Sequence, residues 1–441
     1  MIDNYFRTFW YLHKFNRSAY WSRKEICAFQ DKQIKHIVKY AYDNVEFYHR
    51  ILREQGILPD DVKGRTDLSK LPIIRKDAIR NNYASFLSKR FQPHQLRKLS
   101  TSGSTGKPLF IFISPDEDKS RKARHLRAHI ACGQKPRDKW VVITSPNHFG
   151  ATTKFQRMLN FYVPVPISVF KSIGEQILTI EALNPSVLDG YSSSLYLLAR
   201  EIDARKSKTI HPGFIVGGAE LIDDSSKSFV EEVFDAPFLD QYACVEVDRI
   251  SWQCPEKVGY HMDSDALFLQ FTDSDGIEVA KGEAGHIVCT SLFNYAMPLI
   301  RYDIGDMGVE SDDECPCGRK LPLMKVIEGR SDSNLILPSG RILSPRAFTV
   351  AINMFPEYGL FDQYRIIQRK VDHFVLMIKT KGKRVDDTAV SNNIVNHLNR
   401  TLNLESEMIN FEVRFVDEIP VSKTGKLMIV VSEVNKLLHE V

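Results

Sequence analysis

The sequence has no long uninterrupted apolar run, no low-complexity tract and no block of like charge. A helix needs about 20 consecutive apolar residues to cross a bilayer, so the sequence predicts no transmembrane segment. Lysine and arginine number 59 against 55 aspartates and glutamates, and the small excess is not clustered, which argues against a nucleic-acid-binding protein. With 441 residues, 43% hydrophobic and 26% charged, the chain is typical of a globular protein of two or three domains.

Cysteine is also sparse, at seven residues, and no secretory signal precedes the first of them. An odd count without a signal peptide does not fit a disulfide framework. It indicates a reducing compartment, so we expect a cytoplasmic protein whose thiols are available to a metal.

The first 21 residues are aromatic and basic rather than continuously apolar. They predict an amphipathic helix, which either packs on its own domain or lies on a membrane surface. Of these two outcomes we favour packing on its own domain.

The pattern of apolar residues changes along the chain. Up to about residue 95 it is mostly helical, as in the spacing of Ile34, Ile37 and Val38. β-rich runs at 109–113 and 140–144 then alternate with helical runs, and 114–117 has the form of a capping box with proline at the first helical position. This alternation predicts an α/β fold with a large, multilayer N-terminal domain over 1–331, its sheets flanked by helices.

A smaller α+β domain is predicted over 332–441. Strands at 364–369 and 374–379 precede a helix over 386–402, and a strand with alternating Phe411, Val413 and Phe415 follows before a last helix. This length and mixture suit one compact module, and we place the boundary near Asp332.

One loop concentrates groups that bind phosphate: five hydroxyl side chains, two glycines and a lysine stand within eight residues. Glycines let backbone N–H groups approach phosphate oxygens, while hydroxyls and an ammonium add hydrogen bonds and charge. It is not a Walker loop, because Pro108 stands where serine or threonine belongs and the loop lies between two predicted strands. The predicted phosphate-binding residues are Ser100, Thr101, Ser102, Gly103, Ser104, Thr105, Gly106 and Lys107.

This loop resembles the phosphate-binding loop of acyl- and aryl-CoA synthetases and related adenylate-forming enzymes. The likeness covers the chain from about Ile34 and is greatest to the phenylacetate–CoA ligase-like branch, including capsule-biosynthesis homologues. The branch markers are 40–48 (YAYDNVEFY), 71–77 (LPIIRKD) and 315–319 (CPCGR). The resemblance implies a small, mobile C-terminal domain and the use of ATP and Mg²⁺ to activate a carboxylic acid as its acyl-adenylate, with release of pyrophosphate.

Further segments resemble the nucleotide-binding motifs of that superfamily in the same order. One resembles the segment that lies against adenine, and another resembles the aromatic-Gly-x-Ser/Thr-Glu motif, whose glutamate helps to hold Mg²⁺, an ion that prefers oxygen ligands. In this chain alanine replaces the glycine and cysteine the hydroxyl, where a backbone N–H can still serve. The residues implied are Gly218, Ala219 and Glu220 in the first segment and Gln241, Tyr242, Ala243, Cys244 and Glu246 in the second.

The resemblance also implies roles for residues nearer the C-terminus. Asp306 grips the ribose hydroxyls, since one carboxylate can accept from both. Arg330 lies near ribose or phosphate, and Asp332 is the hinge between domains. Lys426, in a Pro-x-x-x-x-Gly-Lys loop, bridges the incoming carboxylate and the α-phosphate in the transition state. With Lys107 and Glu246 it completes the implied catalytic set.

The identity of the acid is not fixed by these motifs. Asn147, His148 and Tyr191 occupy places that line the acyl pocket in similar enzymes, and the first two are more polar than a phenylacetate site requires. An aromatic or a more polar acid therefore remains open. CoA is the expected acceptor, and the capsule-type relatives leave an amine or a sugar open as well.

A non-catalytic nucleotide-binding protein is the rival class. Cys244 and the lack of an arginine after Lys426 favour it. The joint presence of Lys107, Glu246, Asp306 and Lys426 favours the enzyme, because a sensor needs no adenylation lysine. A homodimer is left open.

Three cysteines and a histidine form a candidate metal site. His261 follows Cys254 by seven positions, Cys315 follows His261 by 54 positions, and Cys317 stands two positions after Cys315. Three thiolates and an imidazole suit tetrahedral zinc, although the spacing fits neither a finger nor a ribbon. The phenylacetate–CoA ligase-like branch carries a similar arrangement, which implies a structural zinc; ordinary reduced cysteines are the alternative.

Overall fold

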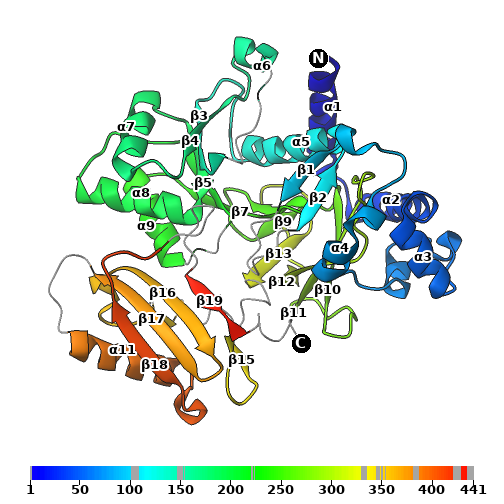
Figure 1. Ribbon diagram of the computed structural model, residues 1–441. Helices are drawn as coiled ribbons and strands as arrows, with labels where there is room; N and C mark the ends of the chain where they lie inside the picture. The colour runs from blue at the N-terminus through cyan, green and yellow to red at the C-terminus, as the bar shows by residue number, and fades with distance from the viewer. Residues whose placement is uncertain are drawn as a thin grey trace.

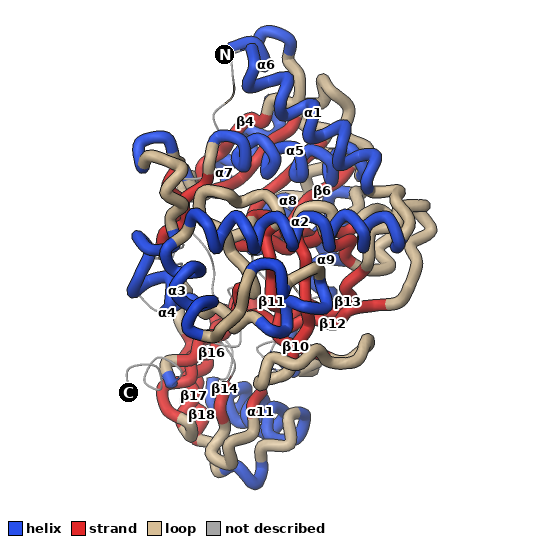
Figure 2. Tube along the Cα trace, turned by 90° about the vertical axis from the view of Figure 1, so that its right-hand side faces the viewer, coloured by secondary structure: helices blue, strands red, loops and turns tan. Residues whose placement is uncertain are grey.

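The computed structural model describes residues 2–100, 109–146, 152, 154–219, 222, 224–328, 335–343, 348, 351–352, 354–380, 387–420 and 429–434. A large body is built around one long sheet, and a smaller body lies beneath it (Figures 1 and 2). The large body contains the helices α1 (Ile2–Ser18), α2 (Arg23–Asn44), α3 (Glu46–Glu54), α4 (Lys76–Asn82), α5 (Pro115–Ala131), α6 (Lys154–Leu159), α7 (Ile173–Leu183), α8 (Ser192–Ala204) and α9 (Asp224–Phe234).

The strands of the large body follow the helical lead-in. They are β1 (Arg97–Ser100), β2 (Phe110–Ile113), β3 (Trp140–Thr144), β4 (Pro164–Ser168), β5 (Val187–Tyr191), β6 (Phe214–Gly218), β7 (Phe238–Cys244), β8 (Asp248–Gln253), β9 (Tyr260–Met262), β10 (Leu267–Thr272), β11 (Ala284–Ser291), β12 (Tyr302–Ser311) and β13 (Leu323–Glu328). β1 and β2 form an antiparallel pair that flanks the serine- and glycine-rich loop.

The long sheet has eleven strands in the order β10-β11-β12-β13-β9-β8-β7-β6-β5-β3-β4. From β4 to β7 the strands are parallel, and from β7 to β10 they are antiparallel. The chain reaches the antiparallel half through the hairpin between β7 and β8. The change from parallel to antiparallel pairing therefore occurs at the edge of the sheet where the parallel strands have their carboxyl ends.

The smaller body is an α+β unit. Its strands are β14 (Leu335–Ile336), β15 (Ile342–Leu343), β16 (Phe361–Lys370), β17 (His373–Thr380), β18 (Asn410–Phe415) and β19 (Val430–Ser432), and its helix is α11 (Asp387–Thr401). Its main sheet has the order β18-β17-β16-β19, and its own buried cluster is separate from the clusters of the large body. The predicted α/β class with a small C-terminal α+β unit is confirmed, whereas the boundary near Asp332 lies outside the described residues.

The N-terminal helix α1 packs on the large body, as favoured from the sequence. Tyr11, Leu12 and Phe15 are buried, and the Tyr11 hydroxyl donates to the Asp116 carboxylate on α5 at 2.6 Å. Among the helices of the described ranges, none is long and apolar enough to span a membrane.

The predicted capping box at the start of α5 is only half correct. The Ser114 hydroxyl accepts from the backbone N–H of Glu117 at 3.2 Å. The Glu117 carboxylate does not return the bond, because it accepts from the Arg121 guanidinium at 2.7 and 2.9 Å instead. The charged Arg121 guanidinium, four residues along the helix, is a stronger hydrogen-bond donor to the Glu117 carboxylate than the backbone N–H of Ser114.

Buried charges join α5 to the antiparallel strands. Four arginines and four carboxylates form this network, so the buried charges balance. Asp263 lies at its centre and accepts from Arg127 at 2.5 Å, from Arg249 at 3.0 Å and from the Trp252 indole at 3.1 Å. These cations hold the pKa of Asp263 below its usual value in spite of the burial. The members are Arg121, Arg124, Arg127, Arg249, Glu117, Asp248, Asp263 and Asp265.

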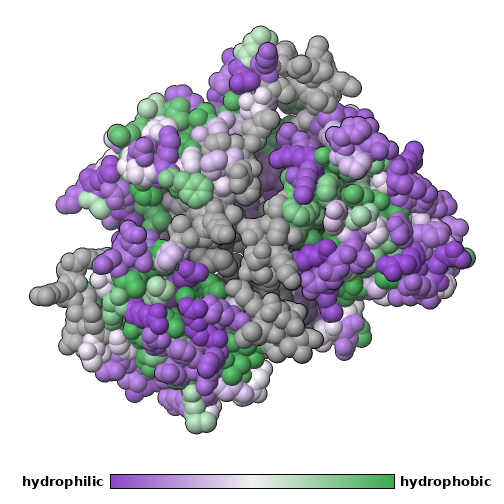
Figure 3. All heavy atoms as spheres, viewed as in Figure 1, coloured by the Kyte–Doolittle hydropathy of each residue, from purple (hydrophilic) through white to green (hydrophobic). Residues whose placement is uncertain are grey.

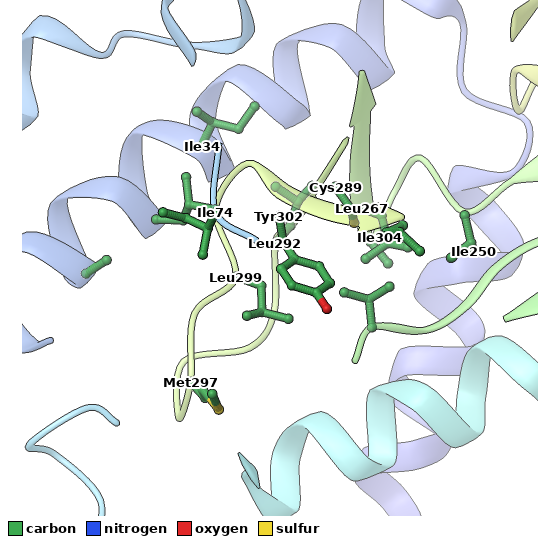
Figure 4. Packing of buried hydrophobic residues seen from close by; sticks show 14 of the residues in the cluster. Ile34, Ile74, Ile250, Leu267, Cys289, Leu292, Met297, Leu299, Tyr302 and Ile304 are labelled. Atoms are coloured by element: carbon green, nitrogen blue, oxygen red, sulfur yellow. The ribbon is translucent and has the colours of Figure 1, made fainter. Parts of the chain in front are cut away.

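The main hydrophobic core of the large body lies between the first helices and the antiparallel strands. Ile34 of α2 and Ile74 face Leu267, Leu292 and strand β12 (Figure 4). Residues from both ends of the large body thus share one core.

We expect Arg127→Met to lower the free energy of unfolding by about 3–5 kcal/mol, because it leaves two buried carboxylates, Asp263 and Asp265, without their shared cation. Urea unfolding followed by fluorescence measures this. Arg137→Met is the matched control, since Arg137 is exposed and its loss should change stability by no more than about 0.5 kcal/mol. Equal effects of the two substitutions would contradict the network.

Candidate active site and cysteine–histidine cluster

The carboxyl ends of three parallel strands bring separate sequence segments side by side. Tyr191 at the end of β5 pairs with Gly218 at the end of β6, and Gly218 pairs with Gln241 of β7. Three of the predicted site segments therefore stand in adjacent register at one edge of the sheet. In open α/β sheets, ligands bind in the crevice outside this edge.

Glycines at the end of β6 permit this close approach. A Cβ on Gly217 would lie 2.0 Å from Cζ of Phe238, and one on Gly218 would lie 3.0 Å from the carbonyl oxygen of Gln241. Ala219 follows with φ of +67°, a left-handed conformation that turns the chain away from the strand. The segment expected against adenine thus lies directly beside the segment that carries Tyr242.

The hairpin between β7 and β8 places Glu246 in a buried position. The loop Val245–Val247 has three residues, and Asp248 takes the left-handed conformation that commonly closes such a loop. Arg121 of α5 donates to the carbonyl oxygens of Val245 at 3.0 Å and Glu246 at 2.8 Å. Arg121 therefore fixes the backbone of the loop, and these two bonds do not involve the Glu246 carboxylate.

Arg124 continues this support one helical turn along α5. It donates to the carbonyl oxygens of Val247 at 3.0 Å and Arg249 at 2.8 Å. His125 lies 3.1 Å from the Asp248 carboxylate, and the pKa of Asp248 is held well below its usual value, since the nearby cations outweigh its burial. The loop is thus held along its whole length.

Tyr302, at the start of β12, donates its hydroxyl to Oε1 of Glu246 at 2.8 Å. Figure 4 shows the ring among apolar side chains with its hydroxyl pointing out of the cluster. Burial and the neighbouring carboxylate raise the pKa of Tyr302 well above its usual value, so the hydroxyl remains a donor. This bond fixes the position of one oxygen of the Glu246 carboxylate.

A second bond joins β7 to β12 at the same place. The Tyr242 hydroxyl donates to Oδ2 of Asp306 at 2.6 Å, although the two residues are 64 positions apart. Asp306 is buried. The two residues assigned to adenine and ribose thus lie in direct contact.

Cys244, which replaces the hydroxyl of the motif, stands at the end of β7. Burial, followed by the charge of Glu246, raises the pKa of its thiol well above the usual value. The thiol is therefore uncharged and does not repel a phosphate. Ala243 beside it is exposed, so the missing glycine leaves no buried clash.

Tyr191 is buried at the end of β5, and its hydroxyl accepts from the backbone N–H of Ser145 at 3.4 Å. This joins the ends of β5 and β3, at the place expected to line the acyl pocket. Asp189, two residues earlier, is a partly buried acid, and desolvation raises its pKa to about 6.

Many predicted site residues lie outside the described residues, so their assignments stay predictions. Ser100 ends β1, and the rest of the phosphate-binding loop is among those not described. The set outside the description is Thr101, Ser102, Gly103, Ser104, Thr105, Gly106, Lys107, Asn147, His148, Glu220, Arg330, Asp332 and Lys426.

Sequence reasoning missed the residues that hold the site together, Arg121, Arg124 and Tyr302. Tyr302 stands four positions before Asp306, to which alone the resemblance assigns a role in this part of the chain. The one available signal for the arginines was their spacing of three on a single helix, which places them on one face. Their partners are more than 120 positions away, so no local pattern could identify them.

The cysteine–histidine cluster lies at the opposite end of β8 from Glu246. The ligand atoms of Cys254, His261, Cys315 and Cys317 all lie within 4.8 Å of one another. The Cys254 and Cys315 sulfurs are 3.5 Å apart, and the Cys317 sulfur lies 3.4 Å from Nε2 of His261. A tetrahedron of thiolates about 2.3 Å from zinc has edges of about 3.8 Å, so the donor set and its size fit this ion.

The surroundings of the cluster suit a structural rather than a catalytic site. Ala19, Trp252 and Leu323 pack around it, and burial lowers the pKa of His261 to about 4, which keeps the imidazole neutral. β8 has six residues, so the cluster lies roughly 20 Å along the strand from Glu246.

The fold has counterparts among solved structures. A crystal structure of 2-hydroxyisobutyryl-CoA ligase in the postadenylation state superimposes with a TM-score of 0.79, covering 96% of this chain and 93% of that one at 18% identity. This is the fold of the adenylate-forming acyl-CoA ligases.

Among characterised sequences, the relatives include phenylacetate–coenzyme A ligase of Thermus thermophilus, 27% identical over 358 residues and 79% of each chain. Protein CapK of Staphylococcus aureus is 24% identical over 433 residues, covering 91% of this chain and 88% of CapK. No protein-family model matches the chain. The resemblance to phenylacetate–CoA ligases and their capsule-type homologues, predicted from the motifs, is confirmed.

We expect Gly217→Ala to separate β6 from β7 and destabilise the protein by about 1–3 kcal/mol, because the new methyl group overlaps the Phe238 ring. In combination with Phe238→Leu, which removes the overlapping atoms, the loss should be smaller than the sum of the two single losses. Thermal unfolding of the four proteins of this cycle measures the coupling.

Gly174→Ala is the matched control for this cycle. Gly174 lies in the first turn of α7, where the nearest atom to a Cβ is 3.4 Å away and alanine favours the helix. Additive losses for Gly217→Ala and Phe238→Leu would contradict the close approach of the two strands.

Proposed function

We propose that this protein is an AMP-forming acid–CoA ligase. It activates a carboxylic acid with ATP to an acyl-adenylate, with release of pyrophosphate, and then transfers the acyl group to CoA. The observation that carries this proposal is the meeting of Tyr242 with Asp306 and of Tyr302 with Glu246 at the carboxyl ends of the parallel strands. The names of the relatives, CoA ligases of aromatic and hydroxy acids, support the same reaction.

The nucleotide binds across the ends of β6 and β7. Adenine lies against the segment from Gly218 to Glu220 and beside Tyr242, and the ribose hydroxyls donate to Asp306. The phosphates lie toward the loop from Ser100 to Lys107. Glu246 holds Mg²⁺, which neutralises phosphate charge when it is bound.

The first half-reaction forms the mixed anhydride. An oxygen of the substrate carboxylate attacks the α-phosphorus, the bond to the β-phosphate oxygen breaks, and pyrophosphate leaves. Lys107 and Lys426 supply positive charge where negative charge gathers on the phosphates and the attacking carboxylate. Arg121 acts indirectly, by fixing the loop that carries Glu246.

The second half-reaction passes the acyl group to CoA. The thiol loses its proton, its sulfur attacks the acyl carbon, and AMP leaves with the bonding electrons. A hinge at Asp332 lets the small domain withdraw Lys426, so that the acceptor can reach the acyl-adenylate. Arg330 stays near ribose or phosphate.

The acid is bound beside Tyr191, Asn147 and His148, and these polar groups suit a polar or an aromatic acid.

The seven cysteines are all unpaired thiols, which supports the expected cytoplasmic location.

Lys426→Ala should lower acid-dependent pyrophosphate release by about 10²–10³ and leave ATP binding nearly intact, since the lysine acts only as the carboxylate attacks. Glu246→Gln should raise the Mg²⁺ concentration needed for half-maximal release, because it removes a charged ligand. A screen of carboxylic acids by pyrophosphate release finds the substrate and supplies both assays.

Lys423→Ala, in the same segment, is the matched control for Lys426→Ala and should keep near-normal turnover. Normal turnover of Lys426→Ala would refute its role. If acyl-adenylate forms but CoA does not accept the acyl group, the acceptor is an amine or a sugar. If no acid supports release, the protein is a nucleotide-binding homologue without turnover.

We also propose a structural zinc ion held by Cys254, His261, Cys315 and Cys317. The compact donor set and its remoteness from Glu246 support this role. Elemental analysis should find about one zinc per chain, and Cys315→Ser/Cys317→Ser should lose the metal and unfold at lower temperature. Cys27→Ser is the control, because Cys27 lies outside the cluster. Protein without zinc, or full zinc in the double variant, would disprove the site.

A further inference from the structure

The N-terminal helix α1 has a second, outward face that its packing does not use. Phe6 is 69% exposed and Trp10 is 54% exposed, and Tyr20 just beyond the helix is also exposed. Phe6 and Trp10 are one helical turn apart, and the Trp10 ring contacts the buried Tyr11 ring edge to face, with ring centroids 4.9 Å apart. An exposed aromatic stripe on a helix that is already packed calls for a partner.

The helix α6 adds to the same surface. Phe161, just after α6, contacts Phe9 of α1 edge to face with ring centroids 5.7 Å apart. Met158 of α6 is 73% exposed. Figures 1 and 2 both show α6 beside the start of α1, at the top of the molecule. In Figure 3 apolar surface stands next to strongly hydrophilic surface at this tip.

Basic side chains predominate on this surface. Within residues 6–18 of α1 and throughout α6 there are five lysines and arginines and no aspartate or glutamate, in a chain where the two signs are nearly balanced. Arg17, Lys154 and Arg157 are exposed. Arg7 is paired with Asp116 of α5 at 2.7 Å, so this carboxylate offsets one of the five positive charges.

Trp10 is held in place between two cations. The guanidinium of Arg7 and the ammonium of Lys14 each lie 5.6 Å from the centre of its ring. Cation–π contacts of this kind keep an exposed ring extended. Tryptophan and phenylalanine flanked by lysine and arginine are the residues that anchor helices at the boundary between lipid headgroups and acyl chains.

We propose that the outward face of α1, together with α6, binds the surface of a membrane rich in anionic phospholipid. The apolar side chains Phe6, Trp10 and Met158 enter the boundary region, and the basic side chains contact the phosphate headgroups. The helix stays packed on the protein and lies on the membrane without crossing it.

The full-length protein should sediment with vesicles made of equal parts phosphatidylcholine and phosphatidylglycerol and not with phosphatidylcholine alone. Binding should weaken as salt is raised, because headgroup attraction is screened. Lys154→Glu/Arg157→Glu should weaken binding by about 20-fold or more, since each basic residue near an anionic surface contributes about fivefold. Phe6→Ala/Trp10→Ala should weaken it by about tenfold.

The matched control is Phe170→Ala/Leu178→Ala. These side chains are 56% and 65% exposed, but Leu178 lies on α7, a helix with two glutamates and no basic residue. This variant should bind as the wild type does, and unfolding curves should show all variants folded.

Three outcomes would overturn the proposal. The first is no sedimentation with the anionic vesicles, and the second is equal binding to both vesicle types. The third is unchanged vesicle binding by Phe6→Ala/Trp10→Ala together with loss of a dimer in sedimentation velocity, which would assign this face to a second copy of the chain.

Discussion

The hairpin that carries Glu246 depends on the buried arginines of α5. Arg121 and Arg124 donate to four carbonyl oxygens of that hairpin, those of residues 245, 246, 247 and 249. Hydrogen bonds from charged donors contribute about 1.5–3 kcal/mol each to stability. Arg127 ties the same helix to Asp263 and Asp265. One helix thus sets the position of the loop at one end and of the antiparallel strands at the other.

The second constraint is the narrow space between β6 and β7. Gly217 leaves room for Phe238, and this lets the two strands pair up to their ends, where Gly218 meets Gln241. The bond from Tyr242 to Asp306 joins β7 to β12, although three strands stand between these two in the order of the sheet. The same close approach therefore positions the strand ends where we propose that the nucleotide binds.

Local patterns predicted the elements of this fold well. The apolar spacing of α2, the proline-led start of α5, the short strand β3, and β16, β17, α11 and β18 of the smaller body were all apparent, because each depends on residues close in sequence. The predicted last helix lies almost wholly outside the described residues. The capping box failed because Glu117 has a stronger partner in Arg121. The strand β19 was not predicted, since its three residues are recognisable only by their pairing with β16.

The site was predicted in the same uneven way. Motif resemblance identified Tyr242, Glu246 and Asp306, which the structure brings together, and the four metal-binding candidates, which β8, β9 and β13 place at one end of the sheet. It could not identify Arg121 or Tyr302. Their roles arise from contacts between elements far apart in sequence, and the local sequence does not predict which elements will be in contact.

The central claim is that ATP is cleaved between its α- and β-phosphates by attack of a carboxylate. Incubating the protein with ATP, Mg²⁺ and a substrate acid, without CoA, and separating the nucleotide products tests it most directly. We predict AMP-containing products and pyrophosphate in equal amounts, formed only when the acid is present. If the carboxylate of the acid is labelled with ¹⁸O, the oxygen that joins the acyl group to the phosphate of the acyl-adenylate should carry the label. Formation of ADP and inorganic phosphate instead would contradict the account.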